Sequence, residues 1–136
     1  MSKFDIVCKA SDRMNEKNDC TVKALSIACR VPYNTAHDAL KQMGRKKGKG
    51  ATNAQWMEAI YLLGCEFEET LWPKQKNGSS YTPKTIGKAY KRGYYVVHFR
   101  GHVAAMINGE IQDWTVGRKH RVLAVFKVTV PKGSRS

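Results

Sequence analysis

The stretch HVAAMINGEIQDWT, residues 102–115, is typical of two short strands joined by a tight turn. Asn108-Gly109 is the dipeptide that best fits a two-residue β-hairpin loop, because both residues tolerate a positive φ there. With these two as the loop, the strands are His102–Ile107 and Glu110–Thr115 and their register is fixed. The expected cross-strand pairs are Ile107–Glu110, Met106–Ile111, Ala105–Gln112 and Ala104–Asp113.

This register brings a histidine and a carboxylate together. Side chains alternate along a strand, so His102 and Ala104 share one face. Asp113, opposite Ala104, lies on that face as a diagonal neighbour of His102, and Trp114 is expected on the other face, beside Val103. A carboxylate bound to one ring nitrogen fixes the tautomer and leaves the other nitrogen available as a base. The alternative is a structural His–Asp pair on the sheet surface.

A helix that begins at a cysteine supplies a candidate nucleophile. Asn18-Asp19 is a good N-cap pair for residues 20–30, CTVKALSIACR, which are apolar apart from one narrow polar stripe and should be buried through the middle of the domain. The first N–H groups and the helix dipole favour the Cys20 thiolate and can stabilise an oxyanion. Asp19 should point away from the sulfur as a cap. The alternative is that Cys20 is simply buried, like Cys29.

The remaining elements follow an α+β order, with helices first and antiparallel strands after. No internal repeat or second domain is visible, so residues 1–136 are predicted to form one domain. The further expected elements are helices at 32–44 and 52–64 (the latter opened by a Thr52–Gln55 capping box), a short helix at 82–90, strands at 65–71, 94–99 and 121–130, a polar connection at 72–81 and a basic tail at 131–136.

The charge is unusual for a chain of 136 residues. Lys and Arg number 24 against 11 Asp and Glu, which gives a net charge of +13 and a pI near 9.8. Such a surface favours anionic partners such as nucleic acid or an acidic protein, or it is merely solvated. The segment GRKKGKG, residues 44–50, is expected to be a mobile basic loop. No apolar run is long enough for a membrane span or an export signal, so we expect a cytoplasmic protein.

The cysteines and histidines argue against a metal or other cofactor. The four cysteines form no Cys-x-x-Cys pair, and Cys8, Cys29 and Cys65 are interpreted as small buried side chains. His98 and His102 have the spacing of metal ligands on a helix, but the segment is predicted as strands and lacks a third ligand. His98 remains a rival base, expected to share a sheet face with His102. The other two histidines, His37 and His120, are predicted to be solvated.

Several of these motifs together resemble a known family. NDCTVKAL at 18–25, VPY at 31–33 and GRKKGKG at 44–50 are similar to the opening of small papain-like proteins encoded by bacteriophages, which are related to the peptidases that trim double-glycine leaders from bacteriocins. GHVAAMING at 101–109, followed by QDW at 112–114, matches their second half. The resemblance spans roughly residues 15 to 116.

The resemblance implies a papain-like fold in which a central helix carries the nucleophile Cys20 and the sheet carries His102 and Asp113. It implies a cysteine peptidase or related acyl transferase that cleaves a peptide, isopeptide or other amide bond through an acyl-thioester. The substrate would be a protein or peptide, an acidic one suiting the charge, and the enzyme would act in the cytoplasm of a bacterial host.

One position departs from the family pattern. Papain-like peptidases place a glutamine six residues before the nucleophile to complete the oxyanion hole, and Met14 stands there. Asn15 or Asn18 can supply the required amide, and Asn15 is preferred. If neither reaches the site, a binding-only papain fold is the alternative. A rival from another class is a non-enzymatic, basic host-takeover protein that binds nucleic acid or an acidic bacterial protein.

Overall fold

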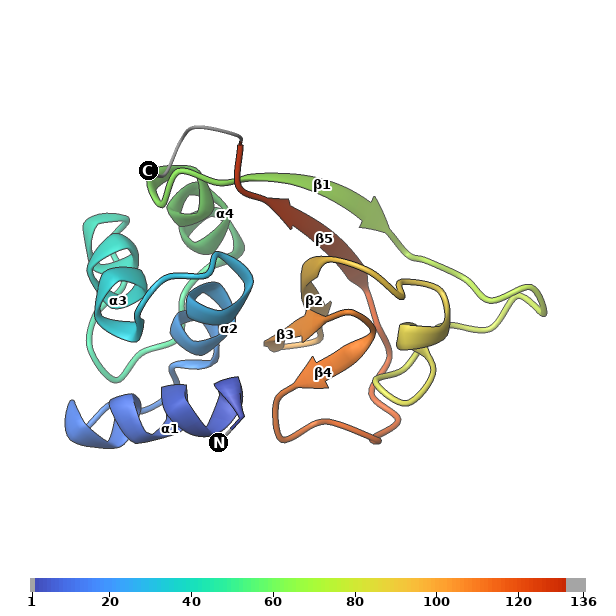
Figure 1. Cartoon of the computed structure of the whole chain (residues 1–136), viewed down its shortest axis with the longest axis horizontal. Helices are drawn as coiled ribbons and strands as arrows, with labels where there is room; N and C mark the ends of the chain where they lie inside the picture. The colour runs from blue at the N-terminus through green and yellow to red at the C-terminus, as the bar shows by residue number, and fades with distance from the viewer. Residues whose placement is uncertain (1, 132–136) are drawn as a thin grey trace.

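The computed structural model describes residues 2–131, so the predicted basic tail at 131–136 lies outside the described residues except for Pro131. The fold is α+β, as the order of elements predicts, with the helices first along the chain and the strands after them (Figure 1). The helices are α1 (Lys3–Arg13), α2 (Cys20–Ala28), α3 (Tyr33–Gln42) and α4 (Asn53–Leu62), and the strands are β1 (Glu66–Leu71), β2 (Tyr94–Phe99), β3 (His102–Ile107), β4 (Glu110–Gln112) and β5 (Ala124–Thr129).

The strands form one antiparallel sheet in the order β1-β5-β2-β3-β4. The hairpin register predicted from Asn108-Gly109 is confirmed through the pair Ala105–Gln112. β4 then ends, three residues earlier than expected, because Asp113 starts a turn in which its carbonyl accepts the N–H of Val116. β5 begins at Ala124 rather than at 121.

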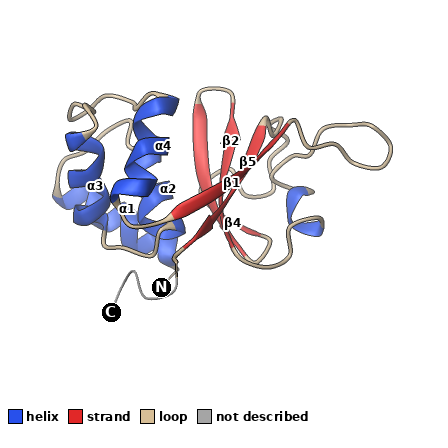
Figure 2. Ribbon diagram, turned by 90° about the horizontal axis from the view of Figure 1, so that it is seen from above, coloured by secondary structure: helices blue, strands red, loops and turns tan. Residues whose placement is uncertain are grey.

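The helices pack in one layer against a single face of the sheet, as Figure 2 shows from above. α2 is central and touches each of the other helices as well as β3. Its Val22 and Leu25 are fully buried with Val103 and Phe126 from the sheet. The apolar composition of α2 therefore has the predicted consequence, which is burial through the middle of the molecule.

α1 is a helix that the sequence analysis did not anticipate. It begins with a capping box in which Ser2 and Asp5 exchange side-chain and backbone hydrogen bonds. Along its length only Val7, Ala10 and Ser11 are buried. The apolar stripe is thus too sparse to stand out in the sequence, and the helix is held by its cap and by packing on α2 and α3.

The second face of the sheet has its own core, covered by the segment 81–90. Ile86 is fully buried there against residues such as Phe99 and Met106. The predicted helix at 82–90 is reduced to one 3₁₀ turn, η1 (Ile86–Lys88). A Cβ on Gly87 would lie 2.1 Å from the carbonyl oxygen of Gly109, so only glycine allows this turn to rest on the hairpin loop.

The basic segment 44–50 is tied to the body of the protein rather than free. Arg45 is 5% exposed, and its guanidinium lies 2.9 and 3.2 Å from the carboxylate oxygens of Glu16. The same carboxylate accepts the N–H of Gly48 at 2.8 Å and lies 2.5 Å from Nε2 of His37. The prediction that His37 is solvated is therefore wrong, because its ring contacts Glu16 in a buried cluster with Arg45.

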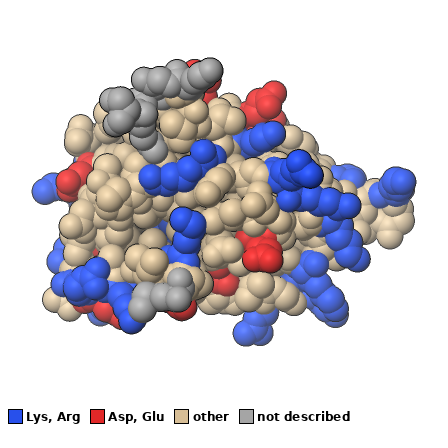
Figure 3. All heavy atoms as spheres, in the orientation of Figure 1, with Lys and Arg blue, Asp and Glu red and all other residues tan. Residues whose placement is uncertain are grey.

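The positive charge is distributed over the surface. On the face shown in Figure 3, Lys and Arg side chains occur towards both ends of the molecule and carboxylates are few. No helix within residues 2–131 is long and apolar enough to cross a membrane.

Candidate active site

Cys20 is the first residue of α2, as expected, but Asp19 does not cap the helix with its side chain. The Asp19 carboxylate instead accepts a hydrogen bond from the Tyr33 hydroxyl at 2.6 Å and pairs with Lys23 at 3.5 Å. The expected cap is therefore wrong. Since no side chain caps this end of α2, its first N–H groups are not taken up by a capping side chain, and the positive end of the helix dipole lies at Cys20.

His102 and Asp113 lie in contact, as the hairpin register predicts. Nε2 of His102 is 2.8 Å from Oδ2 of Asp113, and both side chains are largely buried. The same oxygen accepts the backbone N–H of Thr115 at 3.2 Å and its hydroxyl at 2.7 Å. The carboxylate is thus fixed by the turn that follows it as well as by the imidazole.

Thr115 is a site residue that the sequence analysis missed. It is fully buried and fixes the carboxylate from two residues away. The available signal was the spacing Asp-x-Thr, because an aspartate side chain commonly accepts the backbone N–H two residues on. A strand predicted over all of residues 110–115 is incompatible with this turn, so the turn was not expected.

Cys20 and His102 line the same two hollows, and each shifts the pKa of the other. Because Nε2 faces Asp113, Nδ1 is the ring nitrogen left for the sulfur. Burial by itself raises the pKa of the Cys20 thiol, but the hydrogen bonds from His102 and from the Val103 N–H bring that pKa below its ordinary value. The arrangement favours a thiolate.

The pKa of His102 moves in the opposite direction. Burial lowers it, but the hydrogen bonds to Asp113 and Cys20 outweigh burial and raise the pKa of His102 to about 9. A lowered cysteine pKa beside a raised histidine pKa favours a thiolate–imidazolium pair near neutral pH. Such a pair combines a nucleophile with a proton donor.

Two hollows meet at the sulfur. One has a volume of about 520 Å³ and the other about 330 Å³, and they share Cys20, Gly50, Gly101 and His102. A Cβ on either glycine would meet no atom within 4 Å, so the walls at these positions are open. An extended chain can therefore lie across the sulfur with residues on both sides. The larger hollow is also lined by Asn18, Asp19, Lys23, Asp113 and Trp114, and the smaller by Thr21, Ala51, Thr52, Asn53, Trp56, His98 and Val103.

The two candidate oxyanion residues are placed differently. Asn18 lines the larger hollow, and its amide nitrogen donates to the carbonyl of Gly48 at 3.0 Å. Asn15, the preferred candidate, is exposed and lines neither hollow. Met14 packs against the helical core. Among these positions, only Asn18 places a side-chain amide beside Cys20.

Two sequence expectations about the neighbours of His102 are wrong. His98 pairs with Val103, whereas Phe99 pairs with His102, so the two histidines lie on opposite faces of the sheet. Trp114 is not beside Val103: its ring centroid is 5.2 Å from that of His102. The cause is the early end of β4, since the turn carries Trp114 back over the imidazole.

The remaining cysteines agree with part of the sequence interpretation. Cys29 and Cys65 are buried, but Cys8 is only partly so. Within residues 2–131, no group of three or more histidine, cysteine, aspartate or glutamate side chains is arranged to hold a metal ion. His120 is exposed, as predicted.

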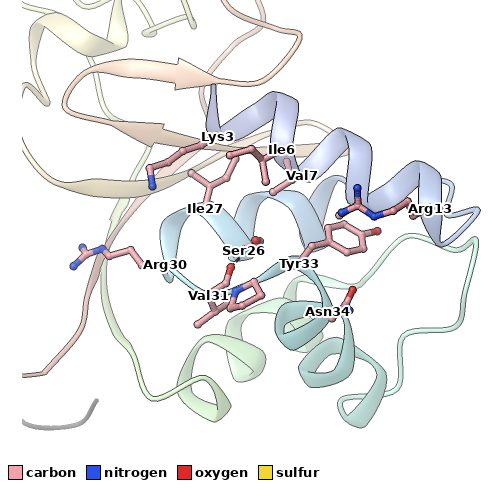
Figure 4. A pocket seen from close by; sticks show the side chains of 12 residues that line it. Lys3, Ile6, Val7, Arg13, Ser26, Ile27, Arg30, Val31, Tyr33 and Asn34 are labelled. Carbon is pink, nitrogen blue, oxygen red and sulfur yellow. Dashed lines mark hydrogen bonds between the residues drawn. The ribbon is translucent and has the colours of Figure 1, made fainter. Parts of the chain in front are cut away.

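A separate hollow of about 420 Å³ lies at the other end of α2, beside α1 (Figure 4). Lys3, Arg13 and Arg30 stand around an apolar floor that includes Ile27 and Val31. No cysteine, histidine or carboxylate is among the described residues that line it, so it lacks the groups that meet at Cys20.

Comparisons of the chain with models of protein families, with curated proteins and with solved structures find no match.

Proposed function

We propose that this protein is a cysteine hydrolase with a papain-like catalytic arrangement, acting on a peptide, isopeptide or other amide bond. The observation that carries the proposal is that Cys20, His102 and Asp113 line one hollow, with Nε2 of His102 2.8 Å from Oδ2 of Asp113 and the other ring nitrogen left for the sulfur. Nucleophile, base and orienting carboxylate are the three groups that acyl transfer through a thiol requires.

The reaction follows from these positions. The Cys20 thiolate attacks the substrate carbonyl carbon, and the carbonyl π electrons move to the oxygen. When the tetrahedral intermediate collapses, the C–N bond breaks and His102 gives its proton to the departing amine. A water molecule then attacks the thioester while His102 accepts the proton of that water, and the acid and the thiolate are released.

The N-terminus of α2 is the proposed oxyanion site. The backbone N–H of Cys20 is at the start of the helix, where no side chain caps it. Asn18 lines the same hollow, and one of its two amide hydrogens is used by the carbonyl of Gly48. The second hydrogen is proposed to donate to the oxyanion, in the role that Met14 cannot fill.

The papain-like assignment rests on chain order as well as on the contacts. A central helix carries Cys20, and the sheet that follows it carries His102, with Asp113 directly after the edge strand β4. Together with the motif resemblance, this favours a phage protein that acts on a protein or peptide in the cytoplasm of a bacterial host. Transfer of the acyl group to an amine instead of water would use the same three side chains.

The test is covalent capture of the acyl intermediate with a p-nitrophenyl ester. One p-nitrophenolate per protein should be released in a burst, and mass spectrometry should find the acyl group on Cys20. His102→Ala should abolish the burst, and Cys8→Ser should leave it unchanged. An acyl group spread over several cysteines, or absent from Cys20, would contradict the proposal.

The net charge of +13 favours a second candidate, a basic protein that binds nucleic acid or an acidic protein without catalysis. Charge-driven binding of a DNA duplex should weaken steeply as salt rises from low to moderate concentration. Such binding, combined with a Cys20 no more reactive than an ordinary cysteine, would favour this candidate.

A further inference from the structure

We propose that the substrate cleft continues past Trp114 into a cationic subsite formed by Arg100, His120 and Arg121, and that this subsite binds an acidic residue of the peptide substrate. The inference rests on the proposed function, since it assigns a substrate class to the same cleft. It starts from a hollow of about 330 Å³ whose lining is Phe99, Arg100, His120, Arg121 and Leu123.

The backbone holds this hollow beside the site. Arg100 lies in the turn between β2 and β3, two residues before His102. The opposite wall comes from the segment leading into β5, which is anchored where the N–H of Leu123 donates to the carbonyl of His98 at 2.8 Å. The N–H of Val122 adds a second bond, to the carbonyl of Tyr81 at 2.9 Å. Both walls are therefore fixed relative to the imidazole.

A closed group of four rings joins the hollow to the catalytic cleft. The His102 ring contacts those of Phe99 and Trp114, with centroids 6.1 and 5.2 Å apart, and His120 contacts the same two rings at 6.0 and 5.7 Å. Trp114 lines the hollow that contains Cys20, and His120 lines the cationic one. A chain leaving the sulfur thus crosses a single aromatic side chain before it meets the arginines.

The lining fits a carboxylate on an aliphatic stem. Arg100, His120 and Arg121 are exposed, and no carboxylate is among the described residues that line the hollow. Guanidinium groups bind carboxylates with two parallel hydrogen bonds. Phe99 and Leu123 supply apolar walls for the methylene groups of a glutamate.

The experiment compares two seven-residue peptides that carry a chloroacetyl group on a central diaminopropionate. In one peptide the flanking residues on both sides are glutamates, and in the other they are glutamines. The second-order rate of Cys20 modification is measured by mass spectrometry at low salt and again at higher salt. We expect the glutamate peptide to react roughly tenfold faster at low salt, as one or two charge-assisted pairs would give, and this advantage to shrink as salt screens it.

The variant Arg100→Gln/Arg121→Gln should remove the advantage of the glutamate peptide while leaving the rate with iodoacetamide unchanged, because neither arginine contacts Cys20. Lys74→Gln/Lys76→Gln is the matched control: it removes the same charge from the exposed loop between β1 and η1 and should keep the advantage.

The outcomes separate the two proposals. If Cys20 reacts with iodoacetamide no faster than the other cysteines, the proposed function fails and the subsite with it. If Cys20 is reactive but the two peptides react equally, or the double arginine variant keeps the preference, only the subsite is wrong. Inhibition of labelling by a single-stranded oligonucleotide but not by a free hexaglutamate peptide would also overturn it, in favour of a nucleic-acid surface.

Discussion

The hydroxyl of Thr115 donates to Oδ2 of Asp113 at 2.7 Å, the same oxygen that faces Nε2 of His102. This bond holds the carboxylate in the position that orients the imidazole. Thr115→Val should therefore loosen the His–Asp pair and lower the alkylation rate of Cys20 near neutral pH by roughly tenfold, the worth of one hydrogen bond to a charged group. Thr115→Ser keeps the hydroxyl and should react like the wild type. Equal rates in all three proteins would show that Thr115 does not position Asp113.

Cys20 should be the most reactive cysteine of the chain. Its pKa is lowered in spite of burial by the hydrogen bonds from His102 and the Val103 N–H, whereas burial raises the pKa of Cys8. Limited alkylation with iodoacetamide at pH 7, followed by peptide mass mapping, should find Cys20 modified first. Faster labelling of Cys8 would contradict the assignment of the nucleophile.

The pH dependence of this reactivity identifies the histidine. Because the pKa of the Cys20 thiol is lowered and that of His102 is raised to about 9, the reactive ion pair should extend to a lower pH than an ordinary thiolate does. In His102→Ala the low-pH part of the profile should disappear, and the rate should rise only as an ordinary thiol ionises. His98 lines the smaller hollow with Cys20 but is not among the groups that shift the Cys20 pKa, so His98→Ala should retain the wild-type profile. The reverse pattern would mean that His98 is the base.

The Glu16 cluster should make the protein acid-sensitive. Burial alone would raise the pKa of Glu16, but Arg45, the Gly48 N–H and His37 lower it from 4.5 to about 2. A carboxyl group whose pKa is lower in the folded state contributes stability that is present above about pH 4.5 and is lost as the pH falls towards 2.

Glu16→Gln should therefore reduce the free energy of unfolding by about 3 kcal/mol at pH 7, since it leaves Arg45 buried without its partner. The difference from the wild type should shrink between pH 5 and about pH 2, measured by urea unfolding. Glu58 is exposed on α4, and Glu58→Gln serves as the control with little change. A difference that stays constant down to pH 2 would assign the effect to packing instead of charge.

The contact between Gly87 and Gly109 should tolerate no side chain. Gly87→Ala places a methyl group 2.1 Å from a backbone oxygen, and the strain should cost about 2 kcal/mol in thermal or urea unfolding. At Gly50 an added methyl group would enter open space, so Gly50→Ala should unfold like the wild type. Equal stability of the two variants would mean that η1 does not rest on the hairpin loop.

The parts of the site that could be predicted are those set by neighbours in the sequence. Asn108-Gly109 dictates the register of β3 and β4, and the register brings Asp113 to His102. The start of α4 follows in the same way from its Thr52–Gln55 capping box, and the start of α2 at Cys20 was also predicted, although not its capping. These features needed no knowledge of the tertiary fold.

The features that could not be predicted depend on contacts between distant segments. Glu16 meets Arg45 across 29 residues, and nothing in the residues around either one signals the pairing. Trp114 lies over His102 because the hydrogen bond between Thr115 and Asp113 forms a turn that ends the strand. Such a side-chain turn competes with the backbone hydrogen bonds of the sheet, and the alternation of side chains along a strand does not show which of the two forms.

The three side chains of the candidate site come from a local hairpin and from a helix that is distant in the sequence. His102 and Asp113 are 11 residues apart in one hairpin, whereas Cys20 reaches them only when α2 docks on β3. A chain that has formed the hairpin but not the helical layer therefore carries an ordinary thiol. The lowered pKa of Cys20 is thus a property of the docked helix and sheet together, and the sequence around the cysteine does not produce it alone.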